Sequence, residues 1–346
     1  MEILIAKVPK AYKFCELVRE NISEYKLYPN EKFVTIIYGV LTTTERDTQG
    51  DCLPISALDN FLNQIRKRTI WFTAEHNPLI QPVGRLIAAD RFYDSEDDIY
   101  FIAGVIGCYD ISSILSFNDI GVNVKNIPRI CPAFPQTIGK PLIELFYNPH
   151  ETKDEIIKEM LNNSPEIVAD KPKIRIRKAA EPMTIIIEIG IAIGLLAALS
   201  FVKSFSSRLG TRTADLFVKK VNTWLKSKVV RGIAKVDSDP FLFEFTSEYK
   251  GCRIRFVVPS KDQELLNRAI NEVGAAARSA AGLIEKVEQF KPTYLVYVFD
   301  LDAKSWLPRH LATEKLGVIS EKAIEVDLKK YNGLSMDGVA SFKKDE

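Results

Sequence analysis

The sequence contains few of the residues that build metal sites and disulfide frameworks. Only three of its 346 residues are histidines, and its five cysteines are scattered at positions 15, 52, 108, 131 and 252. Their number is odd, and no two of them form a Cys-x-x-Cys pair. Such spacing argues against a disulfide framework and against a structural zinc site. We therefore expect no bound metal, and reduced thiols of the kind found in cytoplasmic proteins.

A strong net charge and a phosphate-binding loop are also missing. The chain has 47 lysines and arginines against 45 aspartates and glutamates, which gives a formal net charge of +2. This balance provides no global attraction to nucleic acid, so no nucleic-acid partner is expected. The glycines form no phosphate-binding loop, and no cofactor is predicted. The first ten residues, MEILIAKVPK, lack the basic segment and apolar core of a signal peptide.

Residues 1–150 are predicted to form a mostly β domain with a few short helices. Runs rich in β-branched and aromatic residues are typical of strands. Such runs occur at 33–43, 70–74, 83–90, 99–107 and 142–147. A helix is expected to begin near Ser56, because apolar residues recur after it at helical spacing. These residues are Leu58, Phe61, Leu62 and Ile65.

A long apolar run follows a charged connector at 151–182. The run is MTIIIEIGIAIGLLAALSFV, residues 183–202. A membrane-spanning α-helix needs about 20 apolar residues. The one charge in the run, Glu188, costs roughly 2.5–3.5 kcal/mol deep in a bilayer. Basic residues flank both ends, so the positive-inside rule gives no orientation. The run predicts a single-pass transmembrane helix, and the alternative is a helix buried in a soluble core.

Small residues within this run indicate how such a helix could associate. Gly190 and Gly194 have the GxxxG spacing, which lets two helices approach closely in lipid. The sequence therefore predicts a membrane-bound homo-oligomer formed through Gly190 and Gly194. The domains on either side are expected in the cytoplasm, and a wholly cytoplasmic protein is the alternative localisation.

Residues 203–346 are predicted to form a C-terminal α/β domain. A helical pattern covers 213–230, and the segments 241–245 and 252–258 predict paired strands around a turn. A long alanine-rich helix over about 262–290 is expected to open at Ser260, and a strand follows at 293–300. The whole chain is thus expected to be an α+β protein: a mostly β N-terminal domain, one apolar helix and an α/β domain.

One spacing in the C-terminal domain is similar to that of a metal-dependent nuclease site. Asp239, Glu248 and Lys250 have the D…ExK order, in which carboxylates hold a metal near a lysine. Glu248 and Lys250 fall in the predicted turn between two strands. A solvated turn is therefore the favoured interpretation.

Several motifs in residues 33–147 occur in an order that points to one family. An acidic turn with Gly50-Asp51 follows the first strand, and His76 ends a later strand shortly before Pro82-Val83-Gly84. Further on stand ICPAF at 130–134 and LIEL at 142–145. In this order the sequence resembles the prohead (capsid-maturation) serine proteases of tailed phages, over about a third of the chain.

The resemblance implies a protease-like fold and a catalytic triad. It places Cys131 where the family has its nucleophilic serine, His76 as the base and Glu144 as the residue that orients the base. A thiol beside a histidine can ionise and attack a carbonyl. Pro132, however, has no backbone N–H, and an oxyanion hole often uses the N–H that follows the nucleophile. The pattern therefore favours a degenerate domain that binds protein over an active protease.

Three functional hypotheses remain. A family protease works inside the assembling capsid, which does not fit a membrane helix. The favoured hypothesis is a membrane-associated protein that uses the protease-like domain to bind or sense a protein partner, in bacterial antiphage defence. The first alternative is a membrane-tethered endopeptidase that cleaves a peptide substrate with Cys131 and His76. The second is a soluble structural or assembly protein of phage origin.

Overall fold

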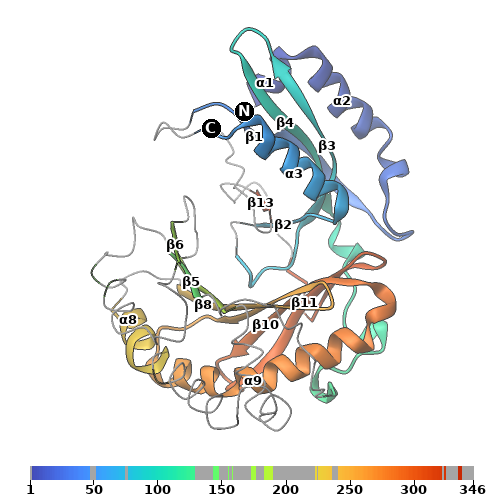
Figure 1. The fold of residues 1–346 in the computed structure, drawn as a ribbon. Coiled ribbons are helices and arrows are strands. Elements are labelled where there is room, and N and C mark those ends of the chain that lie inside the picture. Colours follow the sequence, from blue (N-terminus) through green and yellow to red (C-terminus); the bar gives the residue numbers. More distant parts are fainter. Residues whose placement is uncertain are drawn as a thin grey trace, which may run out of the picture. The chain divides into compact units, whose positions relative to one another are not determined.

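The computed structural model contains two compact units, each with a sheet at its core (Figure 1). It describes residues 2–46, 52–74, 77–128, 143–147, 155, 158, 173–176, 183–189, 223, 225–235, 241–321, 323–324 and 334–336. The first unit combines residues 1–115 with 314–318 and 323–346, and the second combines 116–313 with 319–322. The sequence predicts that the first domain ends near residue 150. In the structure, the N-terminal segment of the first unit ends at Leu115.

The first unit is built on a five-stranded antiparallel sheet with the order β1-β4-β3-β2-β13. Its elements are α1 (Glu2–Lys7), α2 (Pro9–Glu20), η1 (Ile22–Tyr25), β1 (Phe33–Thr43), α3 (Ile55–Lys67), β2 (Trp71–Ala74), β3 (Gly84–Asp94), β4 (Ile99–Tyr109), η2 (Ile111–Ser113) and β13 (Leu334–Met336). Bulges interrupt the registers of β1 and β3 against β4. Bulges bend a strand and increase its twist, so the sheet curls.

The long strands of this sheet form where the sequence predicts them. The predicted strand 33–43 is confirmed, because β1 has the same bounds. The predicted turn between the third and fourth strands is also confirmed at 95–98, with Asp98 in the left-handed region at φ 53°. Asp tolerates this conformation better than most residues. The helix predicted near Ser56 is confirmed as α3, but it begins at Ile55 with Pro54 at the N-cap position, so Ser56 does not cap it.

Helices cover both faces of the sheet (Figure 1). On one face, α3 packs its buried Leu58 and Leu62 against a core that includes Phe72 and Ile106. On the other face, α1 and α2 pack against a separate core that includes Phe101. This is why β4 is an almost unbroken apolar run, since it lies inside the sheet and is buried on both sides.

The second unit is built on a mixed sheet with the order β12-β11-β10-β9-β8-β7-β5-β6. Its elements are η3 (Asn118–Ile120), η4 (Val124–Asn126), β5 (Ile143–Tyr147), β6 (Lys173–Ile176), β7 (Met183–Ile189), the π-helix η6 (Leu225–Val229), α8 (Val230–Ile233), β8 (Phe241–Tyr249), β9 (Cys252–Val258), α9 (Gln263–Lys286), η7 (Glu288–Phe290), β10 (Pro292–Asp300), β11 (Ser305–Thr313) and β12 (Gly317–Ser320). β8 and β9 form the predicted hairpin, and α9 connects the parallel strands β9 and β10.

The helix α9 lies along one face of this sheet (Figure 1). Its Ser279 hydroxyl is 3.2 Å from the Tyr297 hydroxyl on β10, and the Trp306 indole N–H on β11 donates to the Ala269 carbonyl. The predicted long helix is therefore confirmed. It opens at Asp262 rather than at Ser260, because the Asp262 carboxylate accepts the N–H of Leu265.

The prediction of an apolar transmembrane helix at 183–202 is wrong. Met183–Ile189 form strand β7, which pairs parallel with β8 and antiparallel with β5. Isoleucine and threonine dominate this stretch, and β-branched residues favour strands. A short apolar run suits a central strand as well as a buried helix, and periodicity alone does not separate the two. Residues 190–202, with Gly190 and Gly194, lie outside the described residues.

No helix in the described part of the chain is both long enough and apolar enough to cross a membrane. The sequence run that suggested such a helix contributes instead, over the seven residues that are described, to the interior of the mixed sheet. The observed architecture is thus α+β, with a curled antiparallel sheet and a mixed sheet.

Gly282 provides a test of the packing of α9. A Cβ at this position would collide with the backbone carbonyl of Pro128. Alanine favours an isolated helix over glycine by about 1 kcal/mol, yet Gly282→Ala is expected to lower the free energy of unfolding by about 1–3 kcal/mol through this overlap. Chemical denaturation measures the change. Arg268→Ala, at an exposed position of the same helix, is the control and is expected to change stability by less than about 0.5 kcal/mol. A stabilised Gly282→Ala variant would contradict the close approach.

Candidate functional site

The structure describes only one of the three residues that the protease resemblance implies. His76 and Cys131 lie outside the described residues. Glu144 lies on β5, where it is opposite Glu188 of β7 and Lys173 of β6 in the sheet registers. β5 belongs to the mixed sheet of the second unit, whereas β2, the strand before His76, belongs to the sheet of the first unit.

The Pro82-Val83-Gly84 motif leads into a buried ion pair at the start of β3. Gly84 allows β3 to approach Gly107 of β4 so closely that any side chain would collide with its carbonyl. The next residue, Arg85, points into the interior, and its side chain is only 3% exposed. Its partner is Glu31, which is fully buried in the segment before β1.

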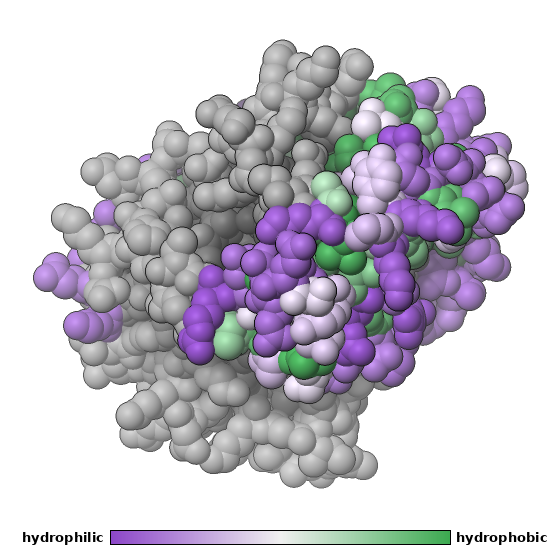
Figure 2. Space-filling view, turned by 90° about the horizontal axis from the view of Figure 1, so that it is seen from above, coloured by the Kyte–Doolittle hydropathy of each residue, from purple (hydrophilic) through white to green (hydrophobic). Residues whose placement is uncertain are grey.

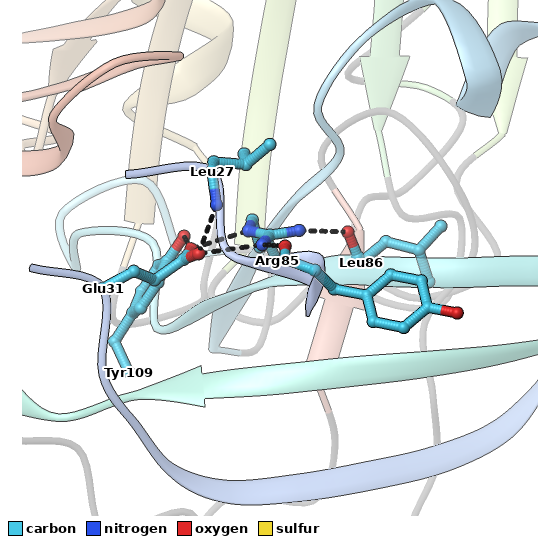
Figure 3. Close-up of polar contacts among 6 residues, drawn as sticks. Leu27, Glu31, Arg85, Leu86 and Tyr109 are labelled. Atoms are coloured by element: carbon cyan, nitrogen blue, oxygen red, sulfur yellow. Dashed lines mark hydrogen bonds and ion pairs between the residues drawn. The ribbon is translucent and has the colours of Figure 1, made fainter. Parts of the chain in front are cut away.

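Arg85 binds Glu31 in the two-pronged geometry typical of guanidinium and carboxylate groups (Figure 3). The Arg85 Nε donates to Glu31 Oε1 at 2.7 Å, and Nη2 donates to Oε2 at 2.9 Å. The remaining donors reach the carbonyls of Tyr25 and Leu86. The carboxylate also accepts the backbone N–H of Leu27 at 2.8 Å. Both charges are therefore hydrogen-bonded throughout, as a buried pair requires.

Aromatic side chains close this network. The Phe33 ring lies 5.6 Å from the Arg85 guanidinium and stacks on the Tyr109 ring at 5.6 Å. The Tyr109 hydroxyl donates to Glu31 Oε1 at 3.4 Å. Burial raises the pKa of Tyr109 well above its ordinary value, so the hydroxyl keeps the proton that it donates. The network fixes the chain immediately before β1, and with it the first residue of β1.

β1 is the outer strand of the first sheet, and none of the described strands pairs with its free edge. The strand has eleven residues, FVTIIYGVLTT, with no charged residue and no proline. Val34 is 62% exposed, and Thr35 is exposed as well. Edge strands usually carry charged residues, proline or bulges that prevent pairing with another chain, and β1 has bulges only near its two ends. An uncharged edge of this length is therefore unusual, and β1 is the feature of the first unit best suited to bind another strand.

A hollow of about 360 Å³ lies beside this edge. It is lined by residues of α1, α2 and β1: Ile5, Ala6, Tyr12, Ile36, Ile37 and Tyr38. The Tyr12 and Tyr38 rings meet edge to face at 6.4 Å. Figure 2 shows that the described surface seen from above is largely hydrophilic, with hydrophobic patches set into it. The hollow, lined by these apolar and aromatic residues, is a recess that can take a side chain of an added strand.

One carboxylate lies next to the hollow. Glu16 Oε2 pairs with Arg19 at 2.7 Å, but Glu16 Oε1 is buried and has no hydrogen-bond partner within the described part of the protein. Burial, and then the charge of Glu16, raises the pKa of Tyr38, so these two side chains are close enough to interact. Glu16 therefore pairs with Arg19 and interacts with Tyr38 at the side of the recess.

The second unit has a polar cluster within its sheet, on β8 to β11. Arg255 of β9 donates through Nε to Glu244 of β8 at 2.6 Å and through Nη1 to the Tyr294 hydroxyl of β10 at 2.9 Å. His310 of β11 lies beside them, with its ring 5.8 Å from that of Tyr294. These four side chains are all at least 95% buried.

His310 is the member of this cluster that lacks hydrogen bonds. Neither ring nitrogen has a partner among the described residues. Burial, together with the positive charges of Arg255 and Arg309, lowers the pKa of His310 to about 3. The imidazole is therefore neutral at physiological pH. A buried polar group without partners destabilises the fold, so the imidazole of His310 lowers the stability of the folded protein.

The nuclease-like spacing does not form a described metal site. Lys250 lies in the β8–β9 turn, in the left-handed region at φ 50°, and pairs with Glu285 at 2.7 Å and Glu288 at 3.1 Å. The predicted turn is confirmed for Lys250, whereas Glu248 lies on strand β8, opposite Arg253 of β9. Asp239 lies outside the described residues, and no group of metal-binding side chains occurs among those that are described.

Sequence reasoning missed the Glu31–Arg85 and Glu244–Arg255 pairs. Partners 54 and 11 positions apart in the sequence have no helical or strand periodicity that would connect them. The sequence did contain a feature that could have indicated the edge. β1 was predicted with its correct bounds, and its lack of charged residues is typical of a strand that is not protected against pairing. Its place at the end of the sheet could not be read from the chain.

Removing Arg85 tests the buried network. Arg85→Ala leaves Glu31 charged and without its main partner, so the free energy of unfolding is expected to fall by about 3–5 kcal/mol. Glu31→Ala is expected to have a similar effect, and the double variant less than the sum of both. Denaturant unfolding measures all three. Arg91→Ala, which breaks the exposed pair with Asp59, is the control and is expected to change stability by less than about 1 kcal/mol. Additive effects of the two buried substitutions would show that the pair is not coupled.

His310 predicts a specific loss of stability in acid. The folded protein keeps the imidazole neutral down to about pH 3, whereas the unfolded chain takes up a proton near pH 6.5. Above pH 6.5 the imidazole is neutral in both states, so protonation does not favour unfolding. As the pH falls from 6.5 towards 3, only the unfolded chain takes up the proton, and the free energy of unfolding decreases. Between pH 7 and 4.5 the protein is expected to lose about 2–3 kcal/mol more than His310→Gln, which does not titrate. Urea unfolding at the two pH values measures the difference. Equal losses in both proteins would show that His310 is not buried as a neutral group.

Comparison with known proteins gives no match. No family model, no curated protein and no solved structure matches this chain. The resemblance to prohead proteases therefore stays a prediction that rests on the motifs in residues 33–147, and function has to be argued from the geometry of the two units.

Proposed function

We propose that the protein is a protein-binding module, and that its first unit captures a segment of another polypeptide as an additional strand along β1. The single observation that carries this proposal is that no described strand pairs with the outer edge of β1, an eleven-residue strand with no charge and no proline. An edge strand presents backbone N–H and C=O groups to any extended peptide. Strand addition of this kind supplies affinity through main-chain hydrogen bonds.

The scaffold around β1 suits this role because it holds the edge in place without a partner. The Arg85–Glu31 network anchors the segment before the strand, and β4 pairs with its inner edge along its length. Bulges occur only near the two ends of β1, between Phe33 and Thr35 and between Val40 and Thr42. The part from Thr35 to Val40 is therefore regular, and a preorganised strand of this kind loses little conformational entropy on binding.

The hollow beside β1 supplies selectivity for side chains. Main-chain hydrogen bonds accept any sequence, whereas pockets for alternate side chains distinguish partners. An added strand directs every second side chain towards the α1 and α2 side of the sheet, where the apolar recess lies. The preferred partner segment is thus extended, with apolar or aromatic residues at alternate positions.

The endopeptidase alternative stays a prediction, because Cys131 and His76 lie outside the described residues. Membrane attachment is not part of this proposal, since the apolar run that predicted a transmembrane helix begins with strand β7.

Photo-crosslinking in cells tests the proposed edge. A photoreactive benzoylphenylalanine is placed at Val34, which is exposed beside the edge, and in a second protein at Tyr93, which is 43% exposed on β3. Irradiation is expected to give a discrete protein adduct from position 34 and none from position 93. Thr35→Lys adds a charge to the edge and is expected to lower the adduct yield about tenfold, as a loss of about 1.4 kcal/mol in binding would.

The controls separate binding from folding. Thr35 is exposed, so Thr35→Lys is expected to leave the unfolding midpoint nearly unchanged. Equal adducts from both positions, or an adduct that survives Thr35→Lys in a folded protein, would mean that β1 is not the binding edge.

A further inference from the structure

We infer that the strand that β1 binds is β1 of a second copy of this chain, paired antiparallel about a two-fold axis at Tyr38. This inference rests on the proposed function and names its partner. A two-fold axis is the commonest symmetry of protein dimers, and it requires a surface that is complementary to itself. β1 meets this requirement in its register, its side chains and its flanking charges.

The regular part of the strand is nearly centred on the axis. Between its two bulges, β1 keeps an unbroken register from Thr35 to Val40, so a second strand can pair there without interruption. Tyr38 lies inside this part. With the axis at Tyr38, Ile36 lies opposite Val40 of the second copy, inside the regular part of both strands. Both are β-branched residues, which strands favour and which pack well across a sheet.

The charged residues nearest to the two ends of β1 are opposite in sign, although Arg46 follows Glu45. Lys32 precedes the strand and Glu45 follows it, and both residues are exposed. Antiparallel pairing about Tyr38 brings Lys32 of each copy close to Glu45 of the other. A parallel arrangement would instead bring like charges together. The electrostatics therefore favour the antiparallel dimer.

The axis also places the two recesses side by side. Tyr38 lines the hollow in each copy, so the hollows meet where the two Tyr38 residues lie opposite each other. Pairing of the two strands would also cover the exposed Val34.

Cysteine cross-linking of the full chain tests the inference. The background carries Cys52→Ser, because Cys52 is exposed. It also carries Cys131→Ser, so that neither thiol competes with the introduced cysteine. Tyr38→Cys places a thiol on the axis, where opposite Cβ atoms are about 4.5–5.5 Å apart, and mild oxidation or a short bismaleimide is expected to give a covalent dimer. Val34→Cys is the matched control. Its two copies would be separated by eight register positions, about 26 Å, and are expected not to cross-link.

A mixed sample fixes the register. Ile36→Cys combined with Val40→Cys is expected to cross-link, because these positions lie opposite each other within the regular part of the strand. Sedimentation is expected to show a dimer whose dissociation constant rises about tenfold or more in Thr35→Lys. A monomer at all concentrations, or efficient cross-linking of Val34→Cys with itself, would overturn the inference. An adduct of another mass from position 34, together with a monomeric chain, would overturn only the second copy and leave strand addition at β1 intact.

Discussion

The free edge of β1 depends on a guanidinium–carboxylate pair that is buried at the start of the first sheet. Arg85 is the second residue of β3 and Glu31 precedes β1, and their two-pronged contact ties these strands together although β4 separates them in the sheet. Removing two charges from water is costly, and the pair is tolerated because backbone carbonyls and an N–H satisfy the remaining donors and acceptors. The geometry of these bonds, more than their energy, sets where β1 begins.

The second unit uses a similar arrangement in its own sheet. Arg255 donates to Glu244 and to a tyrosine hydroxyl, much as Arg85 binds Glu31 with Tyr109 near by. In both units an arginine holds a buried carboxylate, but the Tyr109 hydroxyl donates to the carboxylate in the first unit, whereas the Tyr294 hydroxyl accepts from the arginine in the second. The difference lies in His310, which adds an unsatisfied imidazole to the second cluster. That cluster therefore carries a polar cost that the first one avoids.

The absence of charge on a strand indicates a function only when the strand lies at the edge of a sheet. FVTIIYGVLTT would be unremarkable in the middle of a sheet, where a neighbour on each side would satisfy its backbone groups. At the edge, no described strand pairs with the outer row of backbone groups, and an apolar recess lies beside them. The proposed strand addition rests on this combination, and it requires no catalytic residue. The proposal is thus independent of whether Cys131 and His76 form a dyad.

The sequence by itself determined most local structure: β1, α3, the β3–β4 turn, the β8–β9 hairpin and α9 appear where propensity and periodicity place them. It did not determine the state of residues 183–189, because an isoleucine-rich run suits a buried strand and a buried helix alike, and only pairing with β5 and β8 decides between them. Nor did it show that β1 is an edge, that 143–147 joins the mixed sheet, or that Arg85 meets Glu31. These facts depend on which distant segments lie side by side, and local sequence carries no record of that.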